Sequence, residues 1–164
     1  MKVDRLWAPW RIDYIKASAK KIGGKKQKGC IFCKAAKNIG RDYVIFKTKY
    51  SIAMLNIFPY NNGHIMVAPK RHIKDIAQLG DLEAKDIFQT LKKTKRLLDK
   101  VLRPEGYNIG INISRSAGAG ITGHMHIHIV PRWRGDTNFM TTVSGTKVIS
   151  QSLDELYKQL KKNA

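Results

Sequence analysis

The pattern of hydrophobic and polar positions predicts a series of short β-strands. Each predicted strand is an apolar run enclosed by polar residues, proline or glycine. The runs occupy residues 43–46, 51–55, 64–68, 107–113 and 124–130. A glycine-rich loop at 114–120 joins the last two runs.

Two helices complete the predicted fold. Residues 81–102 repeat apolar side chains at helical spacing, place lysines on the opposite face, and are followed by Pro104 and Gly106, which end a helix. The predicted apolar face comprises Ala84, Ile87, Phe88, Leu91, Leu98, Val101 and Leu102. A capping box at 152–155 begins a short basic helix that ends near Lys161. This order predicts an α+β domain, in which the long helix packs on an antiparallel sheet of about five strands.

Residues 1–29 differ in texture and are expected to form an N-terminal arm. The arm combines an aromatic and basic segment with a lysine-rich segment, 20–28, that is typical of a linker. Trp7 and Trp10 are expected to dock on the body or on a partner subunit, because large aromatic side chains gain most from burial. We therefore divide the chain into this arm and a folded domain over 30–164.

Composition bounds the class of protein. A length of 164 residues and a hydrophobic content of 43% are typical of one soluble domain. No apolar run approaches the ~18–20 residues that cross a bilayer, and the N-terminus lacks the apolar region of a signal peptide. We therefore expect a cytoplasmic protein that does not enter membranes.

The formal net charge of +19 admits two interpretations. A basic chain attracts phosphates, whether in nucleic acid, in nucleotides or in lipid headgroups. Lysine-rich faces also keep a protein in solution, and many lysines here fall on the predicted helices. Solubility is the favoured interpretation. Nucleic-acid binding, or the processing of adenylylated nucleic-acid ends, is an alternative function that the charge alone indicates weakly.

Three of the five histidines alternate along the last predicted strand, as His124, His126 and His128. Alternation places their imidazoles on one face at steps of ~6–7 Å, while the apolar residues between them enter the core. Three ligands spread along a flat strand converge poorly on one metal ion at ~2.0–2.1 Å. Neutral imidazole, with a pKa of about 6.5, is a good nucleophile that can carry a phosphoryl or nucleotidyl group. We therefore favour a nucleophilic histidine that is oriented by its neighbours.

The glycine-rich loop supports phosphate chemistry beside these histidines. Gly118 and Gly120 allow backbone amides to approach an anion, Ser116 and Thr122 offer hydroxyl groups, and Arg115 adds charge. Most glycine-rich loops are only turns. Its position a few residues before the histidines makes this one a candidate phosphate cradle.

Cys30 and Cys33 are the two cysteines of the chain. A pair at this spacing is no disulfide framework, and in a reducing compartment it favours metal binding or redox chemistry. Redox chemistry needs a helix N-terminus in a thioredoxin-like setting, which the sequence does not indicate. Two thiolates leave a tetrahedral metal site incomplete, so a metal site needs further ligands. Two free thiols are the alternative.

Two segments together resemble the histidine-triad (HIT) superfamily. Residues 124–130 carry its pattern of three alternating histidines followed by two hydrophobic residues, and residues 56–72 resemble its other signature block. The long helix lies between the two blocks, as in the family, and the similarity spans roughly residues 30–135. Residues 5–11 and 131–140 resemble the diadenosine tetraphosphate phosphorylase-like branch of bacterial members.

The resemblance implies a role for particular residues. His126 matches the nucleophile that attacks an α-phosphorus and forms a nucleotidyl-histidine intermediate, and His128 matches the histidine that assists the leaving group. Asn56 stands where the family binds the ribose, and His64 matches a histidine near the active site. The phosphate-loop positions are matched by Asn112, Gly120 and Thr122.

The resemblance also implies a cofactor and an assembly. Family members with a cysteine pair use two histidines that match His72 and His124, so these two would complete a closed, structural zinc site with Cys30 and Cys33. No organic cofactor is expected. Members commonly form homodimers with a continuous sheet, and the N-terminal arm could extend such contacts to a tetramer.

The acceptor of the nucleotide defines the reaction that the resemblance implies. Inorganic phosphate as acceptor would make the protein a phosphorylase of dinucleoside polyphosphates, and water would make it a hydrolase. Residues 132–140 favour phosphorolysis by resemblance alone. Hydrolysis of the same substrates, or of other nucleoside phosphoanhydrides and phosphoramidates, is the alternative.

Overall fold

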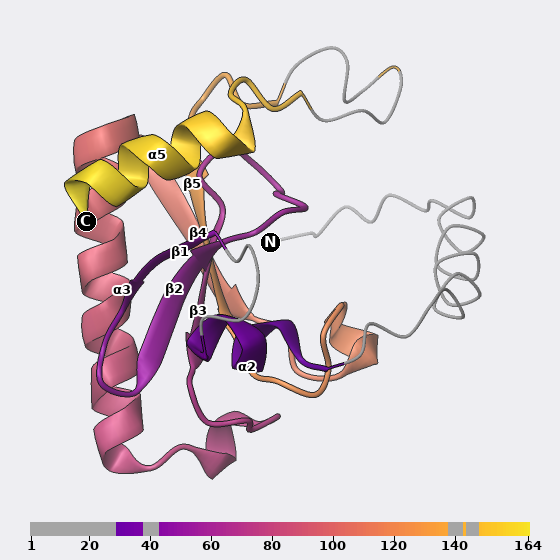
Figure 1. The fold of residues 1–164 in the computed structure, drawn as a ribbon. Helices are drawn as coiled ribbons and strands as arrows, with labels where there is room; N and C mark the ends of the chain where they lie inside the picture. Colours follow the sequence, from indigo (N-terminus) through magenta and orange to yellow (C-terminus); the bar gives the residue numbers. More distant parts are fainter. Residues whose placement is uncertain (1–28, 38–42, 138–142, 144–147) are drawn as a thin grey trace, which may run out of the picture.

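The computed structural model describes residues 29–37, 43–137, 143 and 148–164 (Figure 1). Their helices and strands follow in the order α2 (Ile31–Ala36), β1 (Val44–Lys47), β2 (Ser51–Leu55), β3 (Ile65–Pro69), α3 (Asp81–Leu102), β4 (Gly106–Ile111), β5 (Ile127–Arg132) and α5 (Leu153–Asn163). Two short 3-10 turns, Ile76–Gln78 and Arg115–Ala117, lie in the loops. The predicted N-terminal arm lies outside the described residues, apart from Gly29.

The strands form one five-stranded sheet in the order β1-β2-β3-β5-β4, and each pair of neighbouring strands is antiparallel. The predicted α+β fold with about five antiparallel strands is therefore confirmed. Strand β5 lies inside the sheet, with Met66 of β3 and Gly110 of β4 on either side of His128. This position surrounds the histidine row with backbone on both sides.

Helices α3 and α5 cover one face of the sheet (Figure 1). The buried positions of α3 are Ile87, Thr90, Leu91, Thr94, Leu97 and Leu98. Phe88 was predicted to belong to this face, but its side chain is 66% exposed. The prediction is wrong because successive helical residues are rotated by about 100°, and the buried stripe continues from Ile87 to Thr90 and Leu91. The Thr94 hydroxyl remains satisfied inside the core by donating to the Thr90 carbonyl at 2.8 Å.

The short helix α2 covers the opposite face of the sheet. Its Phe32 and Ala35 are fully buried against residues of β2 and β3. The Lys47 ammonium donates to the carbonyls of Ala35 and Ala36, at 2.5 and 2.9 Å, and so neutralises the C-terminal end of the helix. Helix α2 was not predicted from the sequence, because six residues are too few for helical periodicity to show.

Strand β5 begins at Ile127, three residues after the predicted start at His124. The cause is a change of hydrogen-bond partner. The Met125 N–H donates to the Ile73 carbonyl at 2.7 Å, in the loop after β3, instead of continuing the ladder. In the described part of the chain, no helix is long and apolar enough to cross a membrane.

Candidate active site and metal cluster

The histidine row extends from the residues just before β5 into the strand, on the face that helix α2 covers. Met125, Ile127 and Ile129 enter the opposite core, which confirms the predicted alternation. His124, His126 and His128 are 0%, 4% and 9% exposed. The ring centroid of Phe32 lies 5.0 Å from that of His124 and 4.9 Å from that of His126. The row is thus a nearly enclosed site under α2 and not an open surface.

The hydrogen bonding of His126 fixes which ring nitrogen is available for chemistry. Its Nδ1 lies 2.9 Å from the His124 carbonyl oxygen. A carbonyl can only accept, so Nδ1 carries the proton and Nε2 of the neutral ring carries the lone pair. Nε2 has no hydrogen-bond partner among the described residues. It also retains some exposure, since it does not belong to the fully enclosed polar atoms that lack a partner. His126 therefore presents a free lone pair.

Hydrogen bonds also fix the tautomers of the His64–His128 pair. The Tyr60 backbone N–H donates to His64 Nδ1 at 3.1 Å, so this nitrogen carries no proton. His64 Nε2 must then carry the proton, and it donates to His128 Nδ1 at 2.8 Å. Nε2 of His128 is consequently an N–H group. The His126 and His128 ring centroids are 4.8 Å apart, so the ring that carries the lone pair and the ring that carries the donor are neighbours.

Burial keeps these imidazoles neutral. Desolvation, together with the neighbouring histidines, lowers the pKa of His64 from 6.5 to about 3. Burial and the proximity of His126 lower the pKa of His128 to about 4. Burial also lowers the pKa of His126, although its hydrogen bond to the His124 carbonyl opposes this shift. The neutral forms needed for the tautomers above therefore dominate near pH 7.

Asn56 and its loop border the pair. The Asn56 carboxamide accepts from the Phe58 N–H at 3.0 Å, and its Nδ2 lies 3.3 Å from His64 Nδ1. The Tyr60 ring stacks obliquely on His64, with 4.6 Å between centroids, while its side chain is 56% exposed. Asn56 thus contacts the site through His64. Sequence reasoning did not single out Tyr60, whose only signal is its place within the signature block.

The glycine-rich loop turns sharply before the histidines. Ser114 and Gly118 adopt positive φ values of 72° and 84°, and the Asn112 side chain lies against Gly118. Gly120 and Thr122 are exposed, and the Thr122 hydroxyl makes no hydrogen bond to the described residues. This hydroxyl is available to a ligand. No described contact joins Gly120 or Thr122 to the histidine row.

Four ligand atoms from distant parts of the chain form a cluster. The ligand atoms of Cys30, Cys33, His72 and His124 all lie within 4.8 Å of one another. His124 Nδ1 is 3.2 Å from Cys30 Sγ and 3.2 Å from His72 Nδ1, and Cys33 Sγ is 3.2 Å from His72 Nδ1. Tetrahedral coordination at ~2.0–2.3 Å separates such ligand atoms by about 3.3–3.8 Å. The cluster therefore fits a metal ion and could bind one.

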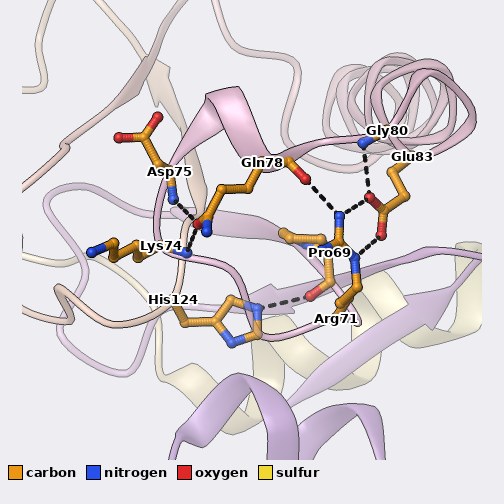
Figure 2. Close-up of polar contacts among 8 residues, drawn as sticks. All are labelled: Pro69, Arg71, Lys74, Asp75, Gln78, Gly80, Glu83 and His124. Carbon is orange, nitrogen blue, oxygen red and sulfur yellow. Dashed lines mark hydrogen bonds and ion pairs between the residues drawn. The ribbon is translucent and has the colours of Figure 1, made fainter.

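The surroundings of the cluster also suit a metal. His124 Nε2 donates to the Pro69 carbonyl at 2.8 Å (Figure 2). This hydrogen bond leaves His124 Nδ1 unprotonated toward the cluster, as a ligand requires. Burial and the hydrogen bond with Cys30 raise the pKa of the Cys33 thiol in the metal-free state. A cation would reverse this effect by favouring the thiolate.

The loop that carries His72 is held by a network that the sequence did not predict (Figure 2). Arg71 forms a forked ion pair with Glu83 of α3, at 2.9 and 2.6 Å, and donates to the Gln78 carbonyl at 2.6 Å. The Gln78 carboxamide accepts from the backbone N–H groups of Lys74 and Asp75. The pair with Arg71 lowers the pKa of Glu83 to about 2. These contacts fix the loop between β3 and α3, and with it His72.

Comparison with known proteins places the domain in a family. The family model of the HIT domain matches residues 39–135, from just after α2 to just beyond β5. An AP-4-A phosphorylase of Mycobacterium tuberculosis is 35% identical, over 97% of this chain and 83% of the relative. An asymmetrical bis(5'-nucleosyl)-tetraphosphatase of Schizosaccharomyces pombe is 34% identical, over 57% of this chain and 50% of the relative. The crystal structure of a Zn-bound histidine triad family protein from Mycobacterium smegmatis is 24% identical, covers 82% of this chain and 92% of its own, and has a TM-score of 0.68.

The matched domain and the relatives define an enzyme. The chain belongs to the HIT family. Cys30 and Cys33 lie before the matched segment, so the family model alone does not include the thiol half of the metal cluster.

Proposed function

We propose that this enzyme cleaves dinucleoside polyphosphates, such as diadenosine tetraphosphate, at the α-phosphate through a nucleotidyl intermediate on His126. The observation that carries the proposal is the free Nε2 lone pair of His126 beside the Nε2–H of His128. The name of the M. tuberculosis relative, an AP-4-A phosphorylase, supports this substrate class. Phosphate is the proposed acceptor, which makes the reaction a phosphorolysis.

The proposed first step uses the two histidines for different tasks. His126 Nε2 attacks the α-phosphorus, and the bond from this phosphorus to the bridging oxygen breaks. The departing polyphosphate is a stable anion near pH 7, so a hydrogen bond from His128 Nε2–H suffices to assist it. The nucleotidylated ring of His126 becomes cationic. The His124 carbonyl, which accepts from Nδ1–H, stabilises that positive charge.

The second step restores the free enzyme. An oxygen of inorganic phosphate attacks the same phosphorus, and the bond to His126 Nε2 breaks. Diadenosine tetraphosphate thus yields ATP in the first step and ADP in the second. Asn56 is proposed to bind the ribose, and Asn112, Gly120 and Thr122 to bind the phosphates. The exposed Thr122 hydroxyl and the turn at Gly118 support the latter proposal.

We propose that the ion held by the four-ligand cluster is zinc. Two thiolates and two imidazoles are a donor set that zinc prefers, and four protein ligands leave no position for water. Such an ion would be structural, since it would join α2 to the loop after β3 and to the start of the histidine row. Cys30 and Cys33 provide the first connection, and His72 and His124 provide the others.

A homodimer is the proposed assembly. Strand β4 is an edge strand whose residues Asn108, Ile109 and Gly110 are exposed, so its outer edge can pair with a second copy. Light scattering at several protein concentrations tests this proposal.

One assay tests the reaction. Diadenosine tetraphosphate is incubated with and without phosphate, and the products are separated. ADP and ATP formed only with phosphate support phosphorolysis. AMP and ATP formed in plain buffer indicate hydrolysis, the activity named for the S. pombe relative, and overturn the choice of acceptor. Lack of turnover under both conditions overturns the substrate class.

A variant tests the intermediate. His126→Ala should abolish turnover, while calorimetry still detects nucleotide binding. Rapid quenching of the wild-type enzyme with α-labelled substrate should give labelled protein, and the variant should give none. A near-normal rate in His126→Ala would refute the covalent mechanism.

A further inference from the structure

The turn after β5 contains a nearly enclosed carboxylate, Asp136. Its side chain is 5% exposed and accepts from Arg132 Nε at 2.6 Å and from the Trp133 backbone N–H at 3.1 Å. It also accepts from Asn61 Nδ2 at 2.8 Å, across 75 residues of sequence. In a chain of net charge +19, this carboxylate thus accepts hydrogen bonds both from the uncharged amide of Asn61 and from the cationic side chain of Arg132. A hydrogen bond to an ionised acceptor is stronger than a neutral one.

Asn61 attaches the loop that precedes β3 to the end of β5. It is 6% exposed, and its Nδ2 also donates to the Pro131 carbonyl at 3.0 Å. Its own carbonyl accepts from the His64 N–H at 3.2 Å, and the Asn56 N–H closes the loop by donating to the His64 carbonyl at 2.9 Å. The Asn61 side chain therefore ties the loop over 56–64 to the end of β5, in addition to the backbone bond that closes the loop.

This loop determines the state of His64. The Tyr60 backbone N–H, which lies within it, occupies His64 Nδ1 and leaves the proton on Nε2. That proton is donated to His128 at 2.8 Å and gives His128 its Nε2–H. A displacement of the loop would weaken both hydrogen bonds, so the donor beside His126 depends on how firmly Asn61 is held.

We propose that Asp136 is a positioning residue for the His64–His128 pair and acts through Asn61. The proposal rests on the proposed function for the role of His128 in turnover. Its structural part, the orientation of the pair, is independent of substrate. A misplacement of about 1 Å in a reacting group can lower a rate by about a hundredfold. Loss of the carboxylate should therefore lower kcat by about tenfold to a hundredfold and change KM little.

Four variants test whether Asp136 acts through Asn61. Asp136→Ala and Asn61→Ala should each lower kcat, and the double variant should be no slower than Asn61→Ala, because both changes break one pathway. Arg132→Gln is the matched control. It removes the two hydrogen bonds that the 45% exposed Arg132 donates to Asp136, keeps the carboxylate that accepts from Asn61, and should change kcat by less than about twofold. Additive losses in the double variant would overturn the route through Asn61.

A spectroscopic measurement separates positioning from stability. In protein labelled with ¹⁵N-histidine, without substrate, the proton between His64 and His128 should give a slowly exchanging imidazole N–H signal. This signal should shift or vanish in Asp136→Ala and persist in Arg132→Gln. If Asp136→Ala lowers Tm but keeps the signal and kcat, the carboxylate is only structural and the proposal is overturned.

Two further outcomes stay interpretable. Should Asp136→Ala fail to fold, Asp136→Asn keeps the volume of the side chain and removes its charge, and the same comparison applies. Should the wild-type enzyme fail to turn over diadenosine tetraphosphate, the proposed function fails. The ¹⁵N comparison still decides the structural part of the present proposal.

Discussion

Acidification should destabilise the folded protein mainly through His64 and His128 between pH 7 and pH 5. In the folded state the pKa of His64 is about 3 and that of His128 is about 4, against 6.5 in the unfolded chain. Below pH 6.5 these two histidines therefore bind protons in the unfolded chain but stay neutral in the folded protein. The free energy of unfolding consequently falls as the pH falls, and it is fully restored above pH 6.5.

The magnitude follows from the width of that window. Each pH unit below 6.5 costs about 1.4 kcal/mol per histidine until the folded pKa is reached. At pH 5 each of the two histidines should therefore contribute a loss of about 2 kcal/mol. That sum is a large part of the ~5–15 kcal/mol that stabilises a typical domain.

Urea unfolding at pH 7, 6 and 5 measures the effect, and His64→Gln isolates it. The glutamine amide can still donate to His128 Nδ1 from the position of Nε2, but it does not titrate. The variant should lose about 2 kcal/mol less than the wild type between pH 7 and pH 5. Protonation of the metal ligands affects both proteins and cancels in the difference. Equal losses in the two proteins would refute the assignment of a neutral, buried His64.

Two further perturbations probe the packing around the site. Gly63→Ala should lower the free energy of unfolding by about 2–4 kcal/mol in urea titrations, since φ is +75° there and the new Cβ would lie 2.5 Å from Leu102 Cδ1. Gly106→Ala is the control, because no atom lies within 4 Å of its new Cβ, and it should change the free energy of unfolding by about 0.5 kcal/mol or less. Exhaustive chelation should remove about one zinc per chain and lower the free energy of unfolding by about 3 kcal/mol or more. Scanning calorimetry should then show a fall in Tm of about 6–12 °C. The Cys33→Ser variant should show the same Tm before and after chelation. An unchanged Tm after metal loss would contradict a structural role.

The sheet and the long helix could be predicted because their signals are local. Residues 81–102 form α3 at the predicted bounds, and each predicted strand exists within a few residues. Phe88 was wrongly assigned to the buried face of α3 because its side chain is apolar. Ile87 and Phe88 are equally apolar, and only the direction of each side chain relative to the sheet separates them. Helix α2 was missed because tertiary contacts hold it: Phe32 packs on the histidine row and Lys47 caps its end.

The members of the metal cluster were predictable, but the hydrogen bonds around the candidate site were not. The spacing of the cysteines and histidines, together with the family resemblance, named the four members of the metal cluster, which the fold brings within 4.8 Å. Asp136 and Arg71 could not be found in this way. Their partners, Asn61 and Glu83, lie 75 and 12 residues away, and no short pattern connects them.

The two histidines just before β5 show what assigns a role to an imidazole. His124 donates Nε2–H to the Pro69 carbonyl and so directs Nδ1 to the metal cluster. His126 donates Nδ1–H to the His124 carbonyl and so keeps Nε2 free for the proposed attack on phosphorus. The residues are chemically identical and share one face, but the nearest carbonyl lies on opposite sides of the two rings. The backbone thus suits His124 to the proposed role of ligand and His126 to the proposed role of nucleophile. Because the carbonyl that orients His126 belongs to His124, a metal ion that anchored His124 would also anchor the proposed nucleophile.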